Sequence, residues 1–118
     1  MKYLFLINAL FEGVFGALAI AAPQVVWAGG DGLALANGRA FGFAALTISL
    51  LSVLVVRQLA NRELVFTALA TLVLWHGGVT IAEVLATVGG YTPPPPAVIH
   101  GLFTVAFVVF FLRKPAAT

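Results

Sequence analysis

Cysteine is absent from this sequence of 118 residues, and charged residues make up only 8% of it. Without a thiol there is no disulfide, no thiol redox relay and no thiolate ligand for a metal. So few charges exclude an ordinary water-soluble domain, in which about one residue in four is charged. The period-two alternation typical of transmembrane β-strands is also missing. These absences leave helical membrane proteins as the class that the composition favours.

Apolar residues account for 62% of the chain, and its mean hydropathy is +1.10. They form four long stretches, and a helix needs about 20 residues to cross a hydrocarbon core about 30 Å thick. We therefore predict an all-α integral membrane bundle of four transmembrane helices in one domain, residues 1–118. The predicted spans are about 3–26, 35–56, 64–88 and 97–112, and the prolines at 93–96 predict a stiff, polyproline-like turn before the last span.

The distribution of basic residues sets the expected orientation. Lysine and arginine accumulate in cytoplasmic loops, so the side of the membrane that carries them is predicted to be cytoplasmic. All basic residues except Arg39 fall on one side of the four-span arrangement: Lys2, Arg57, Arg62, Arg113 and Lys114. Both termini are therefore predicted to be cytoplasmic, in a multi-pass protein of a bacterial-type inner membrane. The net charge of +2 reports this topology, and no nucleic-acid partner is expected.

Five ionisable residues lie inside or at the ends of the apolar stretches: Glu12, Arg39, His76, Glu83 and His100. A charge in hydrocarbon costs between ~2.5 and 17 kcal/mol, so such residues usually face a partner or a wet cavity. Counting about 1.5 Å per helical residue places Glu12 and His76 near the middle of the membrane and the other three nearer its outer face.

Polar residues also recur at helical spacing around these five. His76, Thr80, Glu83 and Thr87 share one face of the third span. Small and polar stripes are expected on the first span, at Asn8, Glu12 and Gly16, and on the second, at Arg39, Gly42, Ser49 and Ser52. Such stripes are predicted to face protein or water.

This pattern predicts an intramembrane pocket that binds a lipophilic or small polar molecule. Glu12 and His76 are the candidate catalytic residues, because a buried carboxyl group beside an imidazole can transfer protons in isomerase-like chemistry. The remaining polar side chains are expected to hold the ligand: Arg39, Glu83, His100, Asn8 and Thr80. No motif specifies a cofactor or a metal, and the lipid bilayer and further copies of the chain are the other expected partners.

Several alternatives remain open. Arg39 and Glu83 can form a structural ion pair near the interface, and each histidine can be a packing residue. His76 and His100 are a minimal bis-histidine set for haem. The central Glu12 also resembles the membrane carboxylate of small multidrug resistance transporters, which exchange protons for drugs. A small accessory subunit of a larger membrane complex is a further candidate.

The whole chain resembles the small bacterial DoxX-like four-helix membrane proteins. The resemblance is carried by Pro23, by Asn37-Gly38-Arg39-Ala40-Phe41-Gly42 at the start of the second span, by His76, and by His100 after the prolines. It implies a four-helix inner-membrane protein and no particular activity. Members linked to quinone redox chemistry make a quinone-like molecule one ligand to consider.

Overall fold

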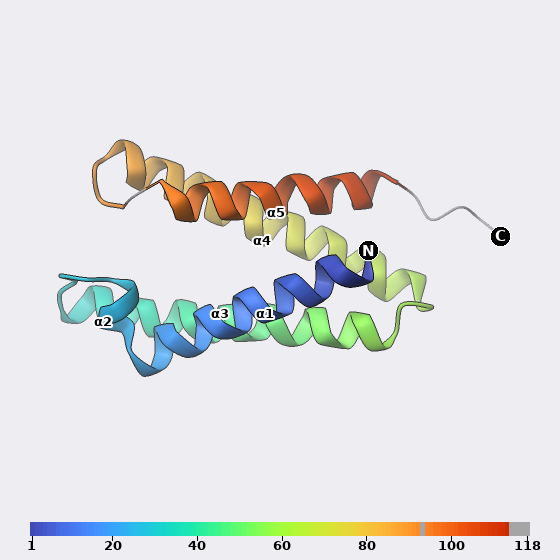
Figure 1. Cartoon of the computed structure of the whole chain (residues 1–118), viewed down its shortest axis with the longest axis horizontal. Coiled ribbons are helices and arrows are strands. Elements are labelled where there is room, and N and C mark those ends of the chain that lie inside the picture. The colour runs from blue at the N-terminus through green and yellow to red at the C-terminus, as the bar shows by residue number, and fades with distance from the viewer. Residues whose placement is uncertain (93, 114–118) are drawn as a thin grey trace. The chain divides into compact units, whose positions relative to one another are not determined.

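The computed structural model describes residues 1–92 and 94–113, and every regular element in these ranges is a helix. In chain order the helices are α1 (Lys2–Ala21), α2 (Pro23–Val26), α3 (Gly32–Arg57), α4 (Arg62–Val88) and α5 (Pro95–Leu112) (Figure 1). Four of them, α1, α3, α4 and α5, are long and apolar enough to cross a membrane. The all-α class is therefore confirmed, while Pro93 and Lys114 lie outside the described residues.

The first long helix ends before the predicted boundary near residue 26. Proline disfavours a helical conformation in the residue before it, and Ala22 accordingly leaves the helix with φ −140° and ψ 61°. The chain re-enters a helix at Pro23, whose fixed φ suits the first position of α2. After the turn, Asp31 accepts a hydrogen bond from the backbone N–H of Ala34 at 2.8 Å, which caps the start of α3.

The prolines before the last helix depart from the sequence-based expectation. Pro94 has helical backbone angles, φ −60° and ψ −30°, and Pro95 occupies the first turn of α5. The described prolines thus begin a helix, and the predicted polyproline-like conformation is wrong for them. The physical reason is that the first turn of a helix needs no N–H donors and accepts the proline φ without strain.

The helices form two compact units, of which the first is Met1–Arg57 with α1, α2 and α3. Here α1 and α3 approach closely at Gly16 and Gly42. A Cβ atom on Gly16 would lie 2.7 Å from the carbonyl oxygen of Gly42, so the two backbones are in direct contact. Small residues at such positions allow close helix packing in membranes, as the glycines in the predicted stripes indicate.

The second unit contains the described residues from Gln58 onward, with α4 and α5 as an antiparallel hairpin (Figure 1). Two glycines that face threonines on the opposite helix show how α4 and α5 are aligned with each other. A Cβ atom on Gly77 would lie 3.8 Å from Cγ2 of Thr104, and one on Gly101 would lie 3.7 Å from Cγ2 of Thr80. These small contacts bring the two helices together around the middle of the hairpin.

The contact between Gly16 and Gly42 yields a stability prediction. Gly16→Ala should destabilise the protein by about 1–3 kcal/mol, because its methyl group meets a backbone carbonyl that cannot rotate away. The measurement is unfolding in mixed detergent micelles. Gly78→Ala is the matched control, since Gly78 lies within α4 and has open space at its Cβ position; this variant should stay within about 1 kcal/mol of the parent. Equal effects of the two substitutions would contradict the close contact.

Candidate functional site

Two buried histidines form the centre of the candidate site within the second unit. His76 on α4 is fully buried and His100 on α5 is 4% exposed. Their Nδ1 atoms lie 2.9 Å apart, a hydrogen-bond distance. Such a contact requires a proton on one Nδ1 and a lone pair on the other. The ring whose Nδ1 accepts the hydrogen bond is therefore a neutral imidazole. The two imidazoles therefore act as one hydrogen-bonded pair.

The rings meet although their backbones lie at different levels of the hairpin. Because Gly101 lies beside Thr80, the His100 backbone is about five residues further along α4 than His76, a height difference of ~7 Å. Counting from the membrane faces predicted such a difference in depth. The imidazole side chains span this height difference. Counting residues along the backbone does not take the length of the side chains into account.

Aromatic rings surround the pair on the α5 side. The His76 ring stacks on Phe103 with centroids 4.8 Å apart and planes at 20°, and it lies 5.5 Å from Phe107 with planes at 16°. Phe107 is fully buried. The histidine pair thus sits among nearly parallel, apolar ring faces. These phenylalanines follow His100 by three and seven residues, a helical spacing that could have pointed to them in the sequence.

Two threonine hydroxyl groups lie one turn from the histidines. Thr80 donates to the backbone carbonyl of His76 at 2.6 Å, and Thr104 donates to that of His100 at 2.8 Å. The two hydroxyl oxygens are 3.4 Å apart. The structure therefore brings the predicted Thr80 to the histidine pair and adds Thr104, which sequence reasoning missed although it lies four residues after His100.

The polar stripe of α1 belongs to the first unit. Asn8 and Glu12 are both fully buried, and the Asn8 amide donates to Oγ of Ser52 on α3 at 2.9 Å. Ser49 donates to the backbone carbonyl of Ala9 at 2.7 Å. Asn8, predicted as a ligand-binding residue, thus joins α1 to α3. Glu12 lies one turn further along the same stripe.

The remaining predicted residues are less enclosed. Arg39 on α3 is exposed, and Glu83 on α4 is half-buried. One Glu83 carboxylate oxygen is buried without a hydrogen bond to any described residue. The predicted five-residue pocket takes Glu12 and Arg39 from the first unit and its other members from the second, so the complete pocket stays a prediction.

The two Nδ1 atoms lie too close together to bind opposite faces of one haem iron. The ligating nitrogens would lie on opposite sides of the porphyrin and about 4 Å apart, given metal–nitrogen bonds of ~2 Å. Here the Nδ1 atoms are 2.9 Å apart and share a hydrogen bond. Two nitrogens at this distance could both bind a smaller metal ion.

Comparison with protein-family models, with curated proteins and with solved structures finds no match to this chain. The site is therefore interpreted from its own geometry.

The hydrogen bond between the histidines can be measured with a double-mutant cycle. His76→Phe or His100→Phe alone should destabilise the protein, because the remaining imidazole is left buried without its partner. The double variant should lose less than the sum of the two, with a coupling of about 0.6–1.7 kcal/mol as for hydrogen bonds between membrane helices. Unfolding in mixed micelles measures all three variants, and strictly additive losses would rule out the bond.

Proposed function

We propose that this chain is a multi-pass inner-membrane protein that binds a small lipophilic molecule and exchanges protons with a polar group on it. The observation that carries the proposal is the contact between His76 and His100, buried in helices long and apolar enough to cross a membrane. Packing alone does not require two imidazoles at this place, since apolar side chains would fill it without any hydrogen-bonding need.

A hydrogen-bonded imidazole pair can pass a proton from one side to the other. In one tautomer, His76 carries its proton on Nδ1 and donates it to the bare Nδ1 of His100. If Nε2 of His76 then accepts a proton, the shared proton moves across the 2.9 Å contact and His100 releases its own proton from Nε2. Each ring ends in its other neutral tautomer, so one proton is transferred and the charge of the pair is unchanged.

The surroundings of the pair favour a flat, apolar ligand with a carbonyl or hydroxyl group. Phe103 and Phe107 offer ring faces, and the histidines offer hydrogen bonds. A quinone-like molecule has this chemistry, in agreement with the resemblance to DoxX-like proteins. The roles predicted from the sequence for Glu12, Arg39 and Glu83 stay predictions, and the histidine chemistry is proposed from the α4–α5 hairpin alone.

The proposal predicts that a lipophilic molecule is retained by the purified protein. Native mass spectrometry in mild detergent should show an adduct, and extraction into organic solvent should identify it. In the double variant His76→Phe/His100→Phe the adduct should fall by about tenfold, the effect of losing one hydrogen bond of about 1.4 kcal/mol. Glu12→Gln separately tests the role predicted from the sequence for Glu12, and it should weaken binding or abolish turnover of the identified molecule.

The matched control is Thr71→Val, because the Thr71 hydroxyl donates to the Thr67 carbonyl of its own helix. This variant should retain the adduct at the level of the parent. A protein that carries no adduct, or one whose adduct is unchanged in the double histidine variant, would contradict the proposed function.

The orientation is part of the same proposal and has its own test. Green fluorescent protein fused after Thr118 should fluoresce in bacterial cells, whereas alkaline phosphatase at the same position should be inactive, because the positive-inside rule places this end in the cytoplasm. The reverse pattern would overturn the proposed topology and leave the histidine chemistry untouched.

A further inference from the structure

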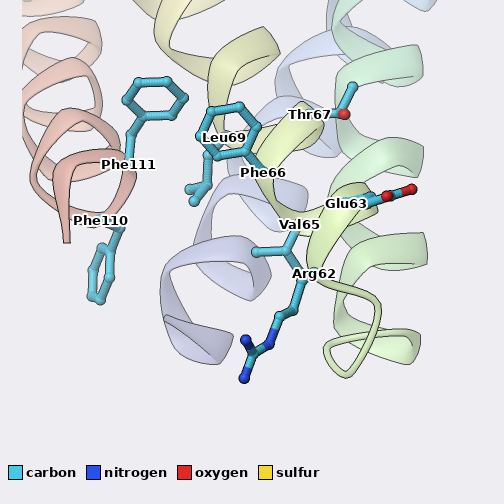
Figure 2. Close-up of a pocket in the computed structure, with 8 residues that line it drawn as sticks. All are labelled: Arg62, Glu63, Val65, Phe66, Thr67, Leu69, Phe110 and Phe111. Atoms are coloured by element: carbon cyan, nitrogen blue, oxygen red, sulfur yellow. The ribbon is translucent and has the colours of Figure 1, made fainter. Parts of the chain in front are cut away.

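A second site lies at the end of the α4–α5 hairpin where α4 begins and α5 ends. A cavity of about 560 Å³ opens there, within the ~300–1,000 Å³ range of ligand pockets. Its lining is largely apolar, with polar groups contributed by the first turns of α4: Arg62, Glu63, Val65, Phe66, Thr67, Leu69, Phe110 and Phe111 (Figure 2). This cavity takes no part in the proposed histidine chemistry.

The lining is arranged along the direction of α4. Arg62, Phe66 and Leu69 recur at i, i+4 and i+7, so they form one stripe with the cation at the helix start and apolar groups ~6 and ~10 Å further in. The Phe66 and Phe111 rings stack with centroids 4.8 Å apart. Figure 2 shows Arg62 and Phe110 directed toward the same end of the hairpin, whereas Glu63 and Thr67 point away from the phenylalanine rings.

We propose that this cavity binds an anionic phospholipid. Its phosphate group lies at the Arg62 guanidinium, and one acyl chain runs along Phe66, Leu69 and Phe111. Arginine binds phosphate oxygens through paired N–H donors and is weakly hydrated, which suits a site at a membrane surface. The occupant must be amphiphilic, because a soluble anion would leave the apolar part of the cavity unfilled.

The charge at this end of the hairpin agrees with an anionic occupant. Arg113 follows the last residue of α5 and is exposed, so two cations, Arg62 and Arg113, lie at this end against the one carboxylate of the lining, Glu63, which points away from the phenylalanine rings (Figure 2). The positive-inside pattern predicts that this end faces the cytoplasm, where basic residues next to a membrane helix meet anionic lipids.

The experiment compares two lipids that differ only in their head group. The full-length protein is delipidated in detergent and titrated with phosphatidylglycerol or phosphatidylcholine of identical acyl chains, and bound lipid is counted by native mass spectrometry. Phosphatidylglycerol should bind about fivefold more tightly, the effect expected for one basic residue near an anionic surface. Arg62→Gln should remove this preference, and Arg62→Lys should retain most of it.

Arg57→Gln is the matched control, because Arg57 is an exposed basic residue on the same predicted side and does not line the cavity. Its preference for phosphatidylglycerol should stay at the parent level. Equal binding of both lipids, or an equal loss in Arg57→Gln and Arg62→Gln, would overturn the proposal. Glycerol phosphate without acyl chains should not compete at millimolar concentration, and full competition would overturn the assignment of a lipid. Failure here leaves the histidine proposal standing, since the two sites share no residue.

Discussion

A polar side chain inside an apolar helix must find its hydrogen-bond partner within the protein, because hydrocarbon offers none. The described structure meets this constraint in each unit with a pair of fully or almost fully buried side chains. Asn8 reaches Ser52 between α1 and α3, and His76 reaches His100 between α4 and α5. Each bond ties two long helices together at a defined rotation, since turning either helix would leave a buried polar group unpaired. The two polar pairs therefore select the faces along which the helices pack.

The two pairs have different chemical consequences. An amide and a hydroxyl group do not gain or lose a proton near neutral pH, so the Asn8–Ser52 hydrogen bond is a structural link. Two imidazoles can exchange a proton, accept one and release one, which makes the second pair a candidate for chemistry as well as for packing. The same hairpin presents at its end a largely apolar cavity with Arg62 in its lining. The two proposed sites thus lie at different places on one pair of helices.

Local sequence signals predicted the helices better than their ends. Long apolar runs predicted four long helices because helix formation in an apolar environment depends on residues close in sequence. Pro23 and the prolines before α5 were harder to interpret, since proline can end one helix or begin the next. Ala22 and Pro94 show both outcomes in this chain, and backbone angles distinguish them where composition does not.

The candidate site likewise has one part that the sequence predicted and one part that it did not. Helical spacing alone placed His76 and Thr80 on one face of α4, because side chains at i and i+4 share a face whatever the helix packs against. Spacing did not show that His100 meets His76. That contact depends on the register between α4 and α5, which Gly77 and Gly101 set by their fit against threonines of the opposite helix, and on the length of the imidazole side chains. Such a register is a property of two distant segments packed together, and no periodicity within either segment contains it.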